Sequence, residues 1–211
     1  MTFRFLAGIS SLVLLYPLVA GISRFKRVSR PVKIICIHIF IAAVFEIISR
    51  WYWLHRQNNL FLLHLYTFWE LEIISLFYLQ LLRQRMMQWG IAAGMIVFAL
   101  FSWADAFYMD GLKHFNTYAR PVACIMMMVY AIVYLYKRLS DAQPISFTKE
   151  AVLILNAAFL FYFSVSFFLF LLSNYMLQDA AKTHTVWAMH TLVAAIFYTT
   201  IGRAIWMAPR Q

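Results

Sequence analysis

Long runs of apolar residues separated by short polar connectors set the pattern of this chain. A helix needs roughly 17–25 mostly apolar residues to cross a bilayer, and seven runs reach that length. They cover residues 3–22, 34–54, 59–82, 88–108, 118–136, 151–177 and 184–207. In lipid the backbone must satisfy its own hydrogen bonds, so runs of this length form helices. The pattern predicts an all-α, polytopic transmembrane bundle of seven helices, with residues 1–211 forming a single transmembrane domain.

The polar connectors between the runs are too short to hold a globular insertion. The longest lie at Ser23–Lys33 and Leu139–Lys149, and His55–Asn58 joins the second run to the third. The chain therefore has no room for a soluble output domain, and any signal must pass to a partner.

Composition points to the same class. Of the 211 residues, 64% are hydrophobic and 12% are charged, and the mean hydropathy is +0.74. A soluble domain has about 25% charged residues, so this chain lacks the charge to cover a water-facing surface. The formal net charge of +10 would suggest nucleic acid in a soluble protein. Here the basic residues sit between apolar runs, so we read them as a topology signal and expect no nucleic-acid partner.

The distribution of Lys and Arg predicts the orientation of the chain. Twelve of the 18 basic residues fall on one side of the predicted membrane: Arg24, Lys26, Arg27, Arg30, Lys33, Arg83, Arg85, Lys137, Arg138, Lys149, Arg203 and Arg210. The other six are Arg4, Arg50, Arg56, Lys113, Arg120 and Lys182. The positive-inside bias places the first set in the cytoplasm, with the N-terminus outside and the C-terminus inside.

The first apolar run also has a feature of a signal peptide. Leu18-Val19-Ala20 resembles a small-residue cleavage site. A signal peptide keeps its positive end in the cytoplasm, but only Arg4 precedes this run and five basic residues follow it. We therefore expect a retained helix with its N-terminus outside.

Ionisable residues inside the spans are the first place to seek function, because each costs about 2.5–3.5 kcal/mol on insertion scales. With a helical rise of about 1.5 Å per residue, Glu70 lies near the midplane, about 16 Å below the start of its span. Four more ionisable residues fall in the same outer half: Glu46, Arg50, His64 and His190. Their shared depth predicts a polar pocket that opens outward.

Helical spacing indicates which side chains share a face. Asn59, Tyr66 and Glu70 lie within about 20° of one another at 100° per residue, whereas His64 points about 140° from Asn59. On the last span, Thr191 and Tyr198 share a stripe with Trp187, and His190 lies on a different one. The candidate ligand-binding residues are Glu46, Arg50, Asn59, His64, Tyr66, Glu70, His190 and Tyr198.

Each candidate also has a structural interpretation. Glu46 and Arg50 are four residues apart and can form an ion pair near the interface. His64 and His190 can each hydrogen-bond a neighbouring helix, as polar residues in bundles do. Glu70 has no basic residue within a turn of its own helix, so it is either protonated or paired across helices. Glu72 points away from the Glu70 face and fits either role.

Several chemistries are absent from the pattern. The last span has no lysine for a retinal-type Schiff base, and no helix has a histidine pair at i, i+4 as in the seven-helix zinc hydrolases. A serine nucleophile elbow and a glycine-rich phosphate loop are also missing. Cys36 and Cys124 lie in apolar runs at different predicted depths, so we expect two free thiols. No metal site and no cofactor is predicted.

The segment from Asn58 to Glu70, NNLFLLHLYTFWE, resembles a recurring segment of small bacterial multi-pass membrane proteins. In these proteins a paired Asn opens a helix and Tyr-Thr-x-x-Glu follows. Trp187, His190 and the aromatic last span resemble the end of the same family. The resemblance covers about two of the seven helices and implies no assigned activity. Some of these proteins accompany signalling kinases, which slightly favours a sensory role.

The leading functional prediction is a sensor or binding subunit for a small molecule or lipid in the bacterial cytoplasmic (inner) membrane. Its expected partners are membrane lipids and a signalling protein, and a homo-oligomer is compatible with the sequence. One alternative is an intramembrane enzyme acting on a lipid headgroup, with Glu70 as acid/base assisted by His64 or His190. Another is a transporter or pore that uses Glu70 in a proton or cation relay.

Overall fold

Helices make up nearly all of the computed structural model, which describes residues 2–140, 150–172 and 180–209. They are α1 (Thr2–Arg24), α2 (Arg30–Leu54), α3 (Leu60–Leu81), α4 (Arg85–Ala104), α5 (Ala119–Ser140), α6 (Ala151–Leu171) and α8 (Ala180–Met207). A 3-10 turn, η1 (Phe25–Arg27), follows α1, and a π-helical turn, η2 (Asp105–Met109), extends α4. The predicted all-α fold is confirmed, and seven α-helices are present within these ranges.

Six of the helices in the described ranges are long and apolar enough to cross a membrane. The qualifying segments are Arg30–Leu54, Leu60–Leu81, Arg85–Met109, Ala119–Ser140, Ala151–Leu171 and Ala188–Met207. The chain is therefore a multi-pass membrane protein. The seventh helix, α1, has 23 residues and packs mainly along α8.

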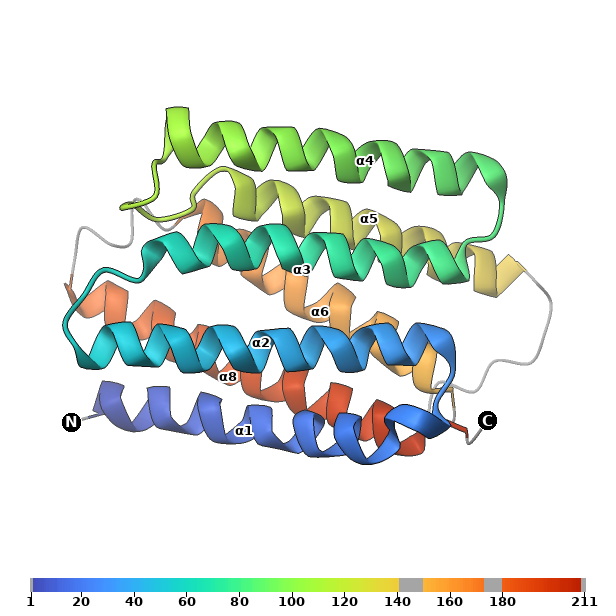
Figure 1. Cartoon of the computed structure of the whole chain (residues 1–211), viewed down its shortest axis with the longest axis horizontal. Helices are drawn as coiled ribbons and strands as arrows, with labels where there is room; N and C mark the ends of the chain where they lie inside the picture. The colour runs from blue at the N-terminus through green and yellow to red at the C-terminus, as the bar shows by residue number, and fades with distance from the viewer. Residues whose placement is uncertain (1, 141–149, 173–179, 210–211) are drawn as a thin grey trace.

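The helices form two layers that cross obliquely. Figure 1 shows α1, α2, α3 and α4 side by side in one layer, with α8, α6 and α5 behind them. Helix α6 packs against α5 and α8, and α4 lies at the edge against α3. The connector between α2 and α3 and the one between α4 and α5 lie at the same end of the bundle, which we call the α2–α3 end. The connectors α1–α2 and α3–α4 lie at the opposite end, the α3–α4 end.

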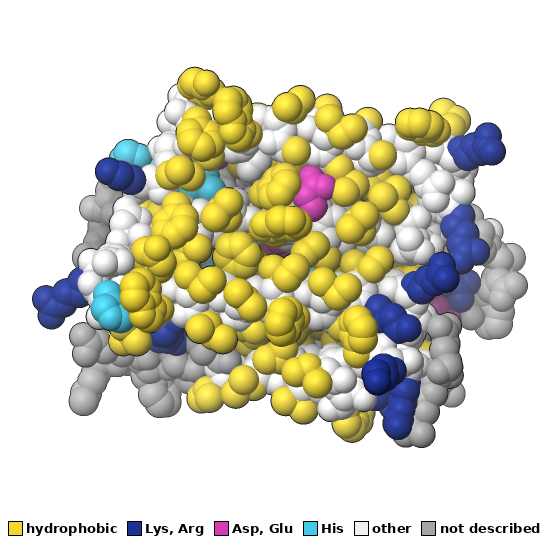
Figure 2. Space-filling view, in the orientation of Figure 1, with side chains coloured by type: hydrophobic (Ala, Val, Ile, Leu, Met, Phe, Trp, Pro, Cys, Tyr) yellow, Lys and Arg dark blue, Asp and Glu magenta, His cyan; other side chains and the backbone are white. Residues whose placement is uncertain are grey.

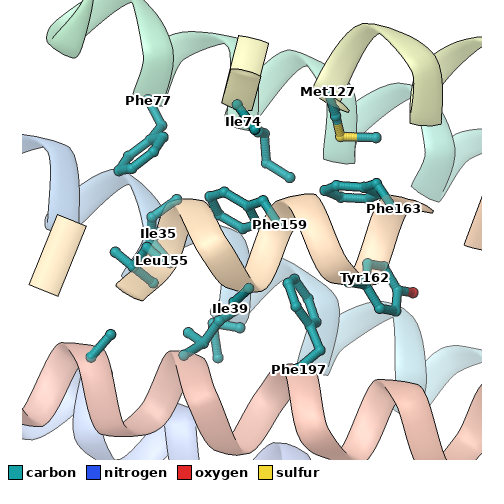
Figure 3. Close-up of a cluster of buried hydrophobic side chains, with 14 of the residues drawn as sticks. Ile35, Ile39, Ile74, Phe77, Met127, Leu155, Phe159, Tyr162, Phe163 and Phe197 are labelled. Carbon is teal, nitrogen blue, oxygen red and sulfur yellow. The ribbon is translucent and has the colours of Figure 1, made fainter. Parts of the chain in front are cut away.

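An aromatic and aliphatic core fills the space between the layers. Phe159 of α6 packs edge-on against Phe77 of α3, with ring centroids 5.6 Å apart, and lies 5.9 Å from Phe197 of α8. Figure 3 shows these rings together with Ile35 of α2 and Leu155 of α6. All five side chains are buried. This core occupies the middle of the bundle on the side toward the α3–α4 end.

The turn between α2 and α3 has a Schellman-type geometry. Arg56 has a φ of 54°, and the N–H of Gln57 donates to the carbonyl of Tyr52 over 2.9 Å. This pattern satisfies carbonyls at the end of a helix and normally places Gly in the left-handed position. The side-chain oxygen of Asn58 then accepts the N–H of Leu60 over 2.8 Å. The paired Asn at this turn therefore serves first to start α3.

The helix bounds differ from the predicted spans by several residues at most ends. Helix α2 begins at Arg30, four residues before the predicted start, because the interfacial residues up to Lys33 continue the helix. Helix α6 ends at Leu171, and the rest of the predicted span to 177 lies largely outside the described residues. Cys36 and Cys124 are both buried free thiols. Also outside the described residues or side chains are Arg4, Lys149, Lys182, His184, Trp187 and Arg210.

Candidate ligand-binding pocket

A pocket of about 510 Å³ lies between the helices, and its lining runs from Trp53 and Asn59 near the α2–α3 connector to Arg120 and Tyr162 inside the bundle. Small-molecule sites usually measure about 300–1,000 Å³ and have mostly apolar walls with a few polar groups. The side chains around this pocket are Leu14, Ala42, Phe45, Glu46, Ser49, Arg50, Trp53, Asn59, Leu60, Leu62, Leu63, Tyr66, Phe115, Arg120, Tyr162, Phe170, His190, Thr191, Ala194 and Tyr198. Six of the eight candidate residues are among them.

The floor of the pocket contains a buried ion pair between α3 and α5. The guanidinium of Arg120 donates from Nη1 to Oε2 of Glu70, and these residues are 2% and 1% exposed. The hydroxyl of Tyr66 donates to the other carboxylate oxygen over 2.9 Å. Removing charges from water costs several kcal/mol each, so both groups need these partners. Glu70 itself lies behind the pocket wall, and Tyr66 and Arg120 connect it to the cavity.

Arg120 is also surrounded by aromatic rings. Its guanidinium carbon lies 5.3 Å from the ring centroid of Phe170 and 5.9 Å from that of Phe163. The hydroxyl of Tyr162 lies 3.5 Å from Nη2. The Nε of Arg120 has no hydrogen-bond partner among the residues that the structure describes. Arg120 is among the residues that line the pocket, so it brings a positive charge to the pocket floor.

The connector before α5 explains how Arg120 reaches this depth. Figure 1 shows that α5 begins further from the α2–α3 end than the neighbouring ends of α3 and α4. Asn116 and Thr117 of the connector are buried, and non-helical backbone at membrane depth requires internal hydrogen-bond partners. The carboxylate of Asp110 accepts from the N–H and hydroxyl of Thr117, over 2.5 and 2.7 Å. Asn116 Oδ1 accepts the N–H of Arg120 over 2.8 Å.

The rim of the pocket has a second, more exposed ion pair. Arg50 Nη2 lies 3.8 Å from Glu46 Oε1, as the i, i+4 spacing predicted. Asn59 donates from its side chain to Ser49 Oγ over 2.7 Å, which links the start of α3 to α2. Arg50 lies over the ring of Trp53 at 5.8 Å. These contacts place polar groups, together with the ring of Trp53, at the mouth of the pocket.

Tyrosine and histidine side chains form the wall on the α6 and α8 side. Tyr162 stacks on Phe197 with ring centroids 4.2 Å apart, and it lies 6.2 Å from the ring of His190. The His190 ring also lies 5.9 Å from Phe170. Tyr198 lines the same wall. The predicted proximity of Glu46, Arg50, Asn59, Tyr66, His190 and Tyr198 is therefore present as a shared cavity.

His64 lies apart from the pocket, on the side of α3 that faces α4. Its Nδ1 is 3.7 Å from Oδ2 of buried Asp105, and its Nε2 is 3.3 Å from the carbonyl oxygen of His114. The large angle between His64 and Asn59 along the helix had indicated a different neighbour. His64 therefore contacts the η2 turn and the α4–α5 connector and does not line the cavity.

Arg120, Tyr162 and Phe170 were missing from the candidates predicted from sequence. The position of Arg120, two residues into a predicted span, suggested a residue at the outer interface. A buried, ionised carboxylate at Glu70 is costly unless a cation pairs with it. This requirement was the signal that could have pointed to Arg120. His38 on α2 was also missed: it is 1% exposed and its ring lies 6.4 Å from that of Tyr66.

Glu72 occupies a separate site on α3, away from the pocket. Its Oε1 is buried and has no hydrogen-bond partner among the described residues. Glu72 is not among the residues that line the pocket, and the buried ion pair joins Arg120 to Glu70 instead.

Comparisons with known proteins find no family model, no curated protein and no solved structure that matches this chain. The resemblance of the Asn58–Glu70 segment to small bacterial multi-pass proteins therefore stays a prediction.

Proposed function

We propose that this multi-pass membrane protein is a binding subunit, or sensor, for a small amphipathic molecule or lipid that enters from the α2–α3 end. The observation that carries the proposal is the buried cation Arg120, which lines a pocket of about 510 Å³ with mostly apolar walls. An acceptor oxygen of the ligand is attracted to the Arg120 guanidinium, and the apolar part of the ligand packs against Phe45, Tyr162 and Phe170. A charged donor makes stronger hydrogen bonds than a neutral one, so it favours a carboxylate or phosphate oxygen.

The proposed membrane is the bacterial cytoplasmic membrane, with the pocket facing outward. The distribution of basic residues supports this orientation. Most Lys and Arg lie at the α3–α4 end, which the positive-inside bias assigns to the cytoplasm. The connectors are too short for an output domain, so a bound state is transmitted to a partner protein.

The enzyme and transporter alternatives draw less support from the geometry. A general acid or base must exchange a proton with its substrate, but Glu70 is held by Arg120 and Tyr66 behind the wall. A carrier needs a route to the α3–α4 end. Between the pocket and that end lie fully buried side chains, including Ile35, Phe77 and Phe159.

A pair of threonines on α8 offers a matched test of binding. Thr191 lines the pocket, whereas Thr199 is exposed on the outer surface of the same helix. Tryptophan at 191 fills the cavity, and tryptophan at 199 faces lipid. We expect native mass spectrometry of the purified wild type and Thr199→Trp to show a copurifying small molecule or lipid that Thr191→Trp lacks. Identical inventories for all three proteins would contradict the proposed pocket function.

A further inference from the structure

A second hollow lies at the α3–α4 end of the bundle, separate from the pocket. Its volume is about 710 Å³, and its lining comes from the starts and ends of three helices, α2, α3 and α5. The lining residues are Ser29, Arg30, Pro31, Gln80, Leu81, Arg83, Tyr134, Lys137 and Arg138. Four of them are cationic, and none of the described lining residues is acidic. We call this hollow the basic groove.

Most of the cationic residues in the groove have no acidic partner among the residues that the structure describes. Arg138 forms an ion pair with Glu150, at 3.0 Å. Arg30, Arg83 and Lys137 have no acidic partner within 4 Å in the described part of the chain. Three like charges gathered around one hollow repel one another, and an anion between them removes that repulsion.

The convergence of these charges goes beyond what membrane orientation requires. The positive-inside bias depends on the number of basic residues on one side, not on their meeting in one place. Lys26 and Arg27 of η1 serve that bias at the same end and do not line the groove. Figure 2 shows Lys and Arg side chains gathered at this end of the bundle. Arg30, Arg83 and Lys137 come instead from three different helices and line one hollow.

The neutral residues of the lining fit an oxygen-rich anion as well. Gln80 and Tyr134 contribute an amide and a hydroxyl that can donate hydrogen bonds. Ser29 starts α2, and its side chain makes no capping hydrogen bond. The groove thus combines four cations, of which only Arg138 has an acidic partner among the described residues, with three uncharged donors. This is the donor set that recognises a phosphate group, and basic pockets between transmembrane helices bind phospholipid headgroups.

We propose that the basic groove binds a phosphate group, in an anionic phospholipid headgroup or in a soluble phosphate compound. Both sources present the same oxygens to Arg30, Arg83 and Lys137. A site at the membrane surface is accessible to either one.

The test measures binding of dioleoylphosphatidylglycerol to the full-length protein in neutral detergent at low salt. Native mass spectrometry compares it with dioleoylphosphatidylcholine for the wild type, for Arg83→Gln/Lys137→Gln and for the control Lys26→Gln/Arg27→Gln. Each basic residue near an anionic lipid contributes about fivefold in affinity, so removing two lowers it about 25-fold. We expect that loss in the groove variant, a small change in the control, and weaker binding of the phosphatidylcholine. Equal binding of the two lipids, or equal losses in both variants, would overturn the proposal.

Thermal unfolding in the same detergent separates the two sources of phosphate. Stabilisation by dioleoylphosphatidylglycerol but not by inorganic phosphate identifies a lipid headgroup. Stabilisation by inorganic phosphate alone, lost in the groove variant, identifies a soluble phosphate compound. If neither ligand stabilises the wild type more than the groove variant, the groove is not a phosphate site. The unfolding temperatures without ligand show whether each variant is folded.

Discussion

Glu70 and Arg120 are separated by fifty residues in the chain and meet in the middle of the bundle. Breaking a buried pair by removing one partner typically costs about 3–5 kcal/mol, because the remaining charge is uncompensated. We expect Glu70→Gln to lower the free energy of unfolding by an amount of this order. Unfolding of the purified protein by SDS, followed by circular dichroism, measures the change.

The exposed pair and a double variant provide the controls for this measurement. Glu46→Gln removes a partly exposed i, i+4 ion pair, which is worth about 0.3–0.5 kcal/mol. Glu70→Leu/Arg120→Met removes both buried charges and should be closer to wild-type stability than Glu70→Gln. A loss in Glu70→Gln no larger than that in Glu46→Gln would show that the pair is not a structural unit.

Of this pair, Glu70 was predicted from the sequence as a candidate residue and Arg120 was not. Glu70 was predictable because a carboxyl near the midplane is costly wherever it faces. Arg120 was not, because its depth depends on a connector that enters the bundle with its own hydrogen bonds. Asp110 and Asn116 provide those bonds, and nothing in the local hydrophobic pattern distinguishes them from residues of an exposed loop.

At the scale of the helices, Gly202 lies where α8 packs tightly against α1. A Cβ atom placed at Gly202 would lie 2.4 Å from the ring of Tyr16 and 3.1 Å from the backbone nitrogen of Pro17. Small residues let transmembrane helices pack this closely. We expect Gly202→Ala to push α1 away from α8 and to destabilise the protein by about 1–3 kcal/mol. Unfolding by SDS measures this loss.

Gly90 of α4 is the matched control for that substitution. A Cβ atom at Gly90 would have no heavy atom within 4 Å. Gly90→Ala should leave stability unchanged or raise it by up to about 1 kcal/mol, because alanine favours a helix. Similar effects at both glycines would mean that backbone freedom, rather than helix contact, controls them.

The helices themselves were largely predictable, whereas their ends and contacts were less so. Apolar runs in lipid leave the backbone no alternative to helix, so all seven helices appear near their predicted ranges. The starts of α2 and α8 were placed too late because polar residues at an interface, such as Arg30, continue a helix as well as apolar ones. Which helices pack together depends on side-chain shape, which a hydrophobicity pattern does not encode.

For the whole molecule, the orientation in the membrane can be tested with two glutamines. Gln57 lies in the α2–α3 connector and Gln84 in the α3–α4 connector, and both are exposed. The native thiols, Cys36 and Cys124, are buried and give little background. We expect a membrane-impermeant maleimide added to intact cells to label Gln57→Cys and not Gln84→Cys. The reverse labelling would place the pocket on the cytoplasmic side.

The membrane class and the polar pocket followed from the sequence, but the arrangement of the pocket did not. The depth estimated along each span predicted that Glu46, Tyr66 and His190 lie in the same half of the membrane. The structure places all three around one cavity. The rotation of each helix about its axis could be compared only within one helix. The angles along α3 therefore indicated that His64 faces away from the cavity. No comparable argument could show that Tyr162 of α6 contributes to it.

Helices α2 and α3 each run from the pocket to the basic groove, so both helices contribute residues to both sites. Helix α3 has Tyr66 in the pocket wall and Arg83 just beyond its end in the groove, and α2 has Arg30 and Arg50. A movement of either helix would therefore change the positions of lining residues in both sites. By thermodynamic linkage, a pocket ligand that changes the affinity of the groove by some factor has its own affinity changed by that same factor. A phosphate group bound in the groove at one end of the bundle would then change the affinity of the pocket for a molecule that enters at the other end.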